Sequence, residues 1–172
     1  MAMQRNPLLM SRILDRGARV APDEVVVTAT EAGTRRQTNR DTRDRAHQLA
    51  HALADAGIGV GDRVGTFMWN GSRHLEAYHA TAGMGAVLHT LNIRLSDTDL
   101  EYIIDHAQDR IIIADADTLP LLEKLNGRMP SVERIVVATE EGLEGWDTSL
   151  PSPVDYEAFI AGKPTEFSWP EI

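Results

Sequence analysis

Short apolar runs alternate with amphipathic helical patterns along residues 24–138, and this alternation constrains the fold more than any other feature of the chain. The runs are rich in β-branched residues, which favour strands, and they cover residues 25–30, 64–68, 86–89, 111–114 and 132–138. Strands joined by helices of about three turns need crossover connections, which place helices on both faces of a parallel sheet. We therefore predict an α/β fold with a layered, mostly parallel sheet.

Local signals place the turns and helices between these runs. Residues 35–38 can return beside 25–30, which predicts an N-terminal β-hairpin. A first helix is expected from Asn39, with its apolar residues on one face and Gly57 as its stop. Further helices are expected to start at Asn70 or Ser72, at Ser96 and at Thr118.

The C-terminal segment differs from this pattern in charge and in proline content. Residues 139–172 carry seven of the nine net negative charges and four of the eight prolines, and two of these prolines flank Ser152. Proline removes a backbone donor and blocks helix formation. We therefore divide the chain into an N-terminal arm (1–23), an α/β subdomain (24–138) and an acidic, proline-containing connector (139–172).

Composition excludes several classes of function. The chain has 172 residues with 17 Lys and Arg against 26 Asp and Glu, so its net charge of −9 disfavours nucleic acid and anionic membranes as partners. Because the chain contains no cysteine, disulfides, thiolate nucleophiles and cysteine-ligated metals are excluded. It has neither a signal-peptide pattern nor an apolar run of about 18 residues, so we predict no transmembrane segment and a cytoplasmic location.

Two local patterns superficially suggest ligand sites. Gly57, Gly59 and Gly61 follow a helix and enter a strand, whereas a phosphate loop follows a strand and opens a helix, so we interpret them as a helix stop and a tight turn. His47 and His51 have the spacing of a two-histidine zinc site, but no third ligand accompanies them. We interpret both histidines as part of a solvated face of the first helix with polar neighbours, and we predict no metal site and no catalytic residue.

The positions that best suit a ligand are the carboxyl ends of the predicted strands, where open α/β sheets bind their ligands. These positions are residues 69–71, residues 89–94 and Asp115. Trp69 could form a ligand wall, but simple packing at the strand end is the interpretation that we favour for it. Asp115 and Asp117 precede a predicted helix, where carboxylates favour the positive end of the helix dipole.

Taken together, these elements resemble the N-terminal part of the adenylate-forming acyl-CoA synthetases. The resemblance rests on Thr38–Arg45, HQLAHALADAGIGVGDRVGTFMWN (47–70), HLEAYHATAGMGAVLHTLNIRL (74–95) and LEYIIDHAQDRIIIAD (100–115). The turn at 82–87 and the segment 89–95 look most like the branch that activates medium- and long-chain fatty acids. Residues 167–170 are similar to the approach to the next family segment.

The resemblance implies an enzyme that uses ATP and magnesium to form an acyl-adenylate and then transfers the acyl group to coenzyme A. In the family, the phosphate loop and the catalytic lysine follow the region that this chain resembles, so no cofactor role is carried onto any residue here. We expect an inactive fragment of a fatty-acid–CoA ligase that contributes a wall of the acyl and adenylate cleft through Trp69, Asn70, His89, Asn92 and Arg94. Apolar faces left bare in a fragment favour a homodimer.

Two other interpretations remain open at this stage. The chain could be a stand-alone flavodoxin-like module that binds a partner or oligomerises without catalysis. It could also be an independent nucleotide-binding protein, which calorimetry with ATP, AMP and acyl-AMP mimics would test. The residues encoded after position 172 would separate the first alternative from the ligase fragment.

Overall fold

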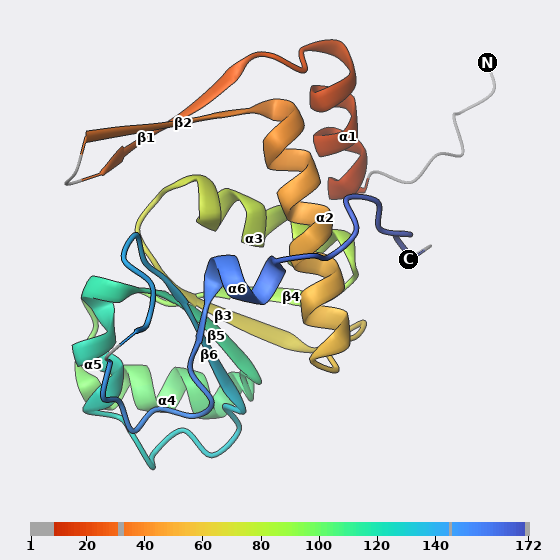
Figure 1. Cartoon of the computed structure of the whole chain (residues 1–172). Coiled ribbons are helices and arrows are strands. Elements are labelled where there is room, and N and C mark those ends of the chain that lie inside the picture. The colour runs from red at the N-terminus through yellow and green to blue at the C-terminus, as the bar shows by residue number, and fades with distance from the viewer. Residues whose placement is uncertain (1–8, 31–32, 145, 171–172) are drawn as a thin grey trace.

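The computed structural model describes residues 9–30, 33–144 and 146–170. Part of the predicted N-terminal arm (1–8) and the tip of the predicted hairpin (31–32) lie outside the described residues. The predicted hairpin is confirmed: β1 (Val25–Thr30) and β2 (Gly33–Thr38) pair antiparallel, with Val25 opposite Thr38. Figure 1 shows that the hairpin extends away from the main sheet.

The main sheet has five strands in the order β4-β3-β5-β6-β7, and every neighbouring pair is parallel. Its strands are β3 (Arg63–Phe67), β4 (Val87–Thr90), β5 (Ile111–Asp115), β6 (Arg134–Ala138) and β7 (Val154–Asp155). The central strands are almost fully buried, as expected for a sheet covered on both faces. The predicted α/β fold with a parallel sheet is therefore confirmed.

Helices cover both faces of this sheet (Figure 1). One face packs against α2 (Asn39–Asp55), α3 (Ser72–Gly83) and α6 (Tyr156–Ile160), and α1 (Met10–Val20) packs outside α2 and α3. The other face packs against α4 (Asp97–Ala107) and α5 (Leu119–Glu123), which follows the short 3-10 helix η1 (Ala116–Thr118). Ile111 and Ile113 enter the first core and Ile112 enters the second, because side chains alternate across a strand.

The helix starts follow the predicted signals at some positions and differ at others. Thr38 and Asp41 form a capping box at α2, and Ser96 caps α4 by accepting a hydrogen bond from the backbone N–H of Asp99. The prediction for α3 was wrong, because its N-cap is Gly71 and neither Asn70 nor Ser72. A hairpin residue replaces the missing cap: the Thr28 hydroxyl oxygen accepts from the backbone N–H of Ser72 at 3.0 Å.

Thr118 lies at the predicted start of α5 but makes no side-chain cap there. Its hydroxyl is hydrogen-bonded to the backbone oxygens of Asp115, at 2.7 Å, and Phe67, at 2.9 Å. The residue therefore ties the end of β3 to the end of β5. A long-range contact of this kind cannot be deduced from the local capping pattern.

The acidic segment that the sequence suggested as a connector has no core of its own, but it packs onto the body. Val154 of β7 pairs with Val136 of β6, and Tyr156, Phe159 and Ile160 enter the core beneath α2 and α3. Two of its prolines precede β7 and the other two follow α6, which leaves the apolar residues between them free to pack. The three domain boundaries themselves stay predictions. Among the helices described, none is both long enough and apolar enough to cross a lipid bilayer.

Candidate functional site

A cavity of about 610 Å³ opens at the carboxyl edge of the sheet. Its walls come from the hairpin, the turn between β3 and α3, the end of β5 and the loop after β6. Trp69 lines the cavity with 52% of its surface exposed, and Asn70 lies beside it. Trp146 contributes a second exposed indole. The cavity therefore lies where ligands of open α/β sheets bind.

Two carboxylates fix the orientation of Trp69. The backbone N–H of Trp69 donates to Asp115 Oδ2 at 2.7 Å, and its indole N–H donates to Asp117 Oδ2 at 2.9 Å. Burial raises the pKa of Asp115 to about 6, because lost hydration outweighs the hydrogen bond from Trp69. The two aspartates thus hold an indole ring in addition to the helix-start role that the sequence suggested for them.

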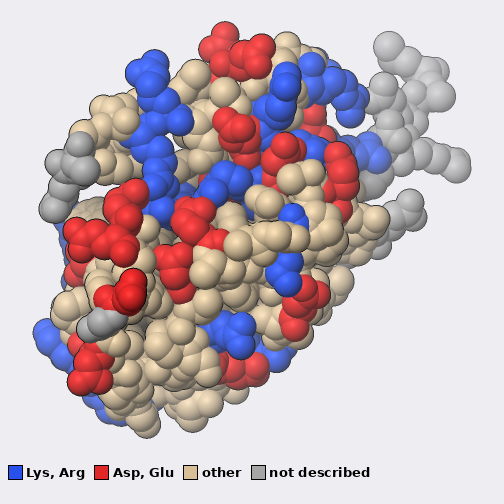
Figure 2. Space-filling view, in the orientation of Figure 1, with Lys and Arg blue, Asp and Glu red and all other residues tan. Residues whose placement is uncertain are grey.

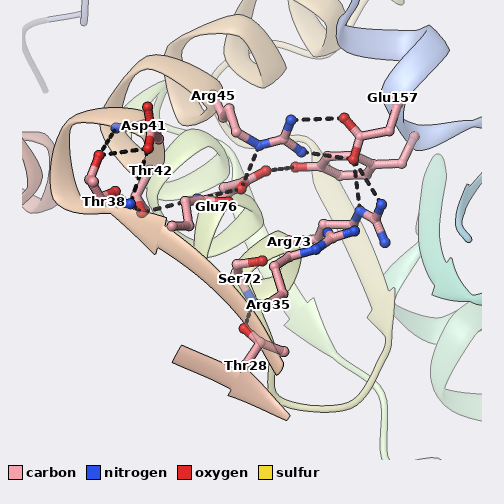
Figure 3. Close-up of polar contacts among 12 residues, drawn as sticks. Thr28, Arg35, Thr38, Asp41, Thr42, Arg45, Ser72, Arg73, Glu76 and Glu157 are labelled. Carbon is pink, nitrogen blue, oxygen red and sulfur yellow. Dashed lines mark hydrogen bonds and ion pairs between the residues drawn. The ribbon is translucent and has the colours of Figure 1, made fainter. Parts of the chain in front are cut away.

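A groove of about 820 Å³ adjoins this cavity and shares with it Arg35, Arg73 and the loop residues that follow β6. Figure 3 shows the polar contacts beneath the groove. The Arg45 guanidinium donates to Glu76 Oε1 at 2.8 Å and to both oxygens of Glu157, at 2.8 and 3.0 Å. A bidentate pair of this kind fixes geometry as well as charge. Arg45 thereby joins α2 to α3 through Glu76 and to α6 through Glu157.

Glu76 is the centre of this network. Its side chain is fully buried on α3 and accepts hydrogen bonds from Arg45, from Gln37 Nε2 at 2.8 Å and from the Tyr156 hydroxyl at 2.7 Å. Burial, together with the neighbouring Glu76 carboxylate, raises the pKa of Tyr156 well above its ordinary value. Burial opposes ionisation of Glu157, but hydrogen bonds from Arg45 and Arg73 outweigh it and lower the pKa of Glu157.

Glu140 extends the network to the hairpin and the loop after β6. Arg73 donates to Glu140 Oε1 at 2.9 Å and Arg35 donates to the same oxygen at 2.7 Å. Arg73 also donates to Glu157 Oε1 at 2.9 Å. Figure 2 shows acidic and basic side chains interleaved across the middle of this face. No local pattern in the sequence predicts these ion pairs, because their partners lie 31 to 112 residues apart.

The structure separates the five residues expected to form the cleft wall. Trp69 and Asn70 line the cavity. Among the described residues that line the cavity or the groove, His89, Asn92 and Arg94 do not appear. His89 Nδ1 is 2.8 Å from Asp109 Oδ2, on the side of the sheet covered by α4. Asn92 Oδ1 accepts from the backbone N–H of Arg94 at 3.0 Å in the turn after β4. Whether any of the five contacts a substrate stays a prediction.

That this chain holds neither magnesium nor a nucleotide by itself stays a prediction. Within the described ranges, no group of three or more His, Cys, Asp or Glu residues is placed to hold a metal. The arginines Arg35, Arg45 and Arg73 are already paired with glutamates, so they do not offer free charge to a polyphosphate. The placement of His47 on a solvated face was wrong, because its side chain is buried against the segment after α6, which His51 also contacts.

The family model for AMP-binding enzymes matches residues 14–166, which is most of the chain. The chain belongs to the AMP-binding enzyme family. It is 36% identical to the 3-methylmercaptopropionyl-CoA ligase of Ruegeria lacuscaerulensis over 98% of this chain and 31% of that protein. It is 50% identical to the long-chain-fatty-acid–CoA ligase of Thermus thermophilus over 90 residues, which are 52% of this chain and 17% of that protein.

Other members of the AMP-binding family extend the comparison. The medium-chain-fatty-acid–CoA ligase of Ectopseudomonas oleovorans is 32% identical over 99% of this chain and 31% of its own length. The crystal structure of the anthranilate CoA ligase AuaEII with anthranoyl-AMP aligns with a TM-score of 0.81 at 23% identity, over 99% of this chain and 30% of that one. The resemblance to acyl-CoA synthetases is confirmed, and the chain spans about a third of the relatives that it matches along its whole length.

Proposed function

We propose that this chain is the N-terminal scaffold of an ATP-dependent ligase that joins medium- or long-chain fatty acids to coenzyme A. The observation that carries the proposal is the 50% identity to a long-chain-fatty-acid–CoA ligase over the 90 best-matched residues. The match to a medium-chain ligase over 99% of the chain supports it independently. In this proposal ATP, magnesium and coenzyme A act in the complete enzyme.

The role proposed for this segment is to shape one wall of the acyl and adenylate cleft. Trp69 supports this role because its ring is exposed while both of its N–H groups are held by aspartates. An oriented aromatic ring offers apolar surface at a small entropic cost. Asn70 lines the same cavity and would belong to this wall. His89 on the edge strand β4, and Asn92 and Arg94 in the turn after it, lie outside this cavity and would have to contact substrate elsewhere in the complete enzyme.

We also propose that the 172 residues have no turnover by themselves. Nucleotidyl transfer depends on positioning and on charge neutralisation by metal ions, lysine and oriented amides. The guanidinium groups best placed beside the cavity are already paired with carboxylates, Arg35 with Glu140 and Arg73 with Glu140 and Glu157. A homodimer and a cytoplasmic location remain predictions, and light scattering that shows a monomer at high concentration would contradict the homodimer.

The test compares the complete reading frame that contains this chain with the isolated 172 residues. Both are purified and assayed for pyrophosphate release and acyl-CoA formation with octanoate, palmitate, 3-methylmercaptopropionate and 3-hydroxybenzoate. We expect the complete protein to prefer octanoate or palmitate and the isolated chain to release no pyrophosphate. Fatty-acid-dependent pyrophosphate release by the isolated chain would overturn its proposed inactivity.

A second candidate substrate follows from the 36% identity to 3-methylmercaptopropionyl-CoA ligases over almost the whole chain. The same panel separates the two candidates, because both acids are activated by the same chemistry and differ only in the apolar part. A kcat/KM higher for 3-methylmercaptopropionate than for either fatty acid would replace the fatty-acid assignment. It would leave the ligase assignment intact.

A further inference from the structure

Residues 163–170, here called the strap, run along α2 without forming a helix or a strand. Figure 1 shows this segment crossing α2 after α6. Gln48 Nε2 donates to the backbone oxygen of Lys163 at 3.1 Å, and Arg43 Nη1 donates to that of Thr165 at 3.1 Å. The Lys163 ammonium pairs with Asp55 at 2.6 Å.

Aromatic packing completes the contact between the strap and the helices. Trp169 lies against Gly83 at the end of α3, where a Cβ atom would be only 2.7 Å from the indole ring. The Phe167 ring lies 5.0 Å from the Trp169 ring and 4.9 Å from the His51 ring. The ring of His47 is 4.6 Å from that of Trp169. The strap therefore docks through two aromatic side chains and a row of hydrogen bonds.

The two histidines of α2 hold the strap in opposite ways. The backbone N–H of Phe167 donates to His47 Nδ1 at 2.7 Å, so this nitrogen must be unprotonated. The other ring nitrogen of His47 then carries the proton and donates to Asp15 Oδ1 at 3.2 Å. His51 Nε2 donates to the backbone oxygen of Glu166 at 2.8 Å, a bond that an imidazolium makes equally well.

Protonation therefore affects only one of these bonds. A second proton on His47 Nδ1 would face the N–H of Phe167, and two donors cannot share a hydrogen bond. The charged groups around His47 are Asp15 on α1, Arg43 on its own helix and Glu166 on the strap. His79 on α3 is titratable and senses the same Asp15 carboxylate. Asp15 and Glu166 favour a charged His47, whereas Arg43 and burial oppose it.

We infer that residues 163–170 form a detachable strap on α2 and that His47 releases it when the imidazole becomes protonated. Release separates the Phe167 N–H from His47 and frees Phe167 and Trp169 from the surface of α2 and α3. This inference does not depend on which acid the enzyme activates.

The direction of the pH dependence follows from the buried position of His47. Burial lowers the pKa of His47 below its ordinary value and outweighs the hydrogen bond to Asp15. The docked state therefore binds the proton less readily than the released state. Docking is complete above the ordinary histidine pKa of about 6.5 and weakens as the pH falls below it.

The test is amide hydrogen exchange of the 172-residue chain, measured by NMR and corrected for intrinsic exchange rates. The measurements run from pH 7.5 to pH 5.0, a range that includes the ordinary histidine pKa of about 6.5. We expect the protection factor of the Phe167 amide to fall about tenfold or more over this range, because one buried hydrogen bond is lost. The amides of β5 should keep their protection, which would show that the fold remains intact.

Two variants separate His47 from its neighbour. In His47→Asn the amide oxygen can accept from Phe167 at all pH values, so the acid-dependent loss of protection should disappear. In the matched control His51→Gln the loss should persist. A wild-type Phe167 amide with constant protection, or an unchanged pH dependence in His47→Asn, would overturn the inference.

A measurement on the unaltered chain covers the case in which His47→Asn fails to fold. The ¹⁵N shifts of the His47 ring report which nitrogen carries the proton. We expect Nδ1 to be unprotonated at pH 7.5, about one unit above the histidine pKa, and its protonation midpoint to coincide with the loss of Phe167 protection. A protonated Nδ1 at that pH, or two unrelated midpoints, would refute the mechanism.

Discussion

Truncation of Glu76 should be the most damaging single substitution in the polar network. Glu76→Ala removes the common acceptor of three donors, which are the Arg45 guanidinium, the Gln37 amide and the Tyr156 hydroxyl. Breaking a buried ion pair by removing one partner costs about 3–5 kcal/mol. Arg45 keeps its bidentate pair with Glu157, which moderates the loss, so we expect a decrease of about 4 kcal/mol in the free energy of unfolding.

Tyr156→Phe is the matched comparison, since it removes one donor and leaves the carboxylate paired with Arg45 and Gln37. The expected cost is about 1.5–3 kcal/mol, the range for one hydrogen bond to a charged group. In the double variant the two losses should not add, because Glu76→Ala has already deprived the Tyr156 hydroxyl of its partner. The coupling energy reports the contact between the two side chains.

Urea unfolding followed by far-UV circular dichroism measures these differences. With a slope near 2 kcal/mol per molar urea, Glu76→Ala should lower the midpoint by about 2 M and Tyr156→Phe by about 0.75–1.5 M. Equal midpoints for Glu76→Ala and the unaltered chain would refute the assignment of Glu76 as the centre of the network. A double variant whose losses add fully would refute the contact with Tyr156.

Three further results are expected. Gly83→Ala should destabilise the chain by about 1–3 kcal/mol, because the new Cβ atom would clash with Trp169. In the control Gly17→Ala, the new Cβ atom meets no atom within 4 Å, so this variant should stabilise α1 slightly. Equal changes in the stability of the two variants, measured by calorimetry, would contradict this prediction. The raised pKa of Asp115 means that the contribution of this residue to stability decreases as pH rises from about 4 to about 6 and is then flat. The difference in stability between Asp115→Asn and the unaltered chain should follow this course, and a carboxyl ¹³C midpoint near 4 would contradict it. In the complete enzyme, Trp69→Ala should raise KM for fatty acids severalfold while Trp69→Phe changes it little, and unchanged kinetics would remove this residue from the cleft wall.

The sequence predicted the elements whose cause is local. The apolar runs at 64–68, 111–114 and 132–138 became the buried central strands within one or two positions, because continuous apolar runs suit a sheet covered on both faces. The runs at 25–30 and 86–89 also became strands, but these lie in the hairpin and at the sheet edge and are partly exposed. Ser96 was recognisable as a cap because its partner Asp99 lies three residues away, whereas the capping box of Thr38 and Asp41, which has the same spacing, was not predicted. The start of α3 was missed because its cap comes from Thr28, which lies 44 residues earlier.

The candidate site was predictable only in outline. The rule for open α/β sheets placed the cavity correctly at the carboxyl edge, near Trp69 and Asp115. It did not reveal that Asp115 and Asp117 hold the Trp69 N–H groups, since these contacts join ends of separate strands. His89 fell into the same predicted set, yet its side chain meets Asp109 across the α4 face, because strand alternation decides which way each side chain points.

The uneven distribution of charge also has a structural explanation. The acidic surplus of residues 139–172 suggested a segment separate from the nearly neutral body. Three of its acidic residues, Glu140, Glu157 and Glu166, instead pair with arginines of the hairpin, α2 and α3. The acidic residues of this segment and the arginines of the body therefore form a single interface. Because Glu157 is partly desolvated and its pKa is lowered, this interface should resist salt better than exposed pairs do.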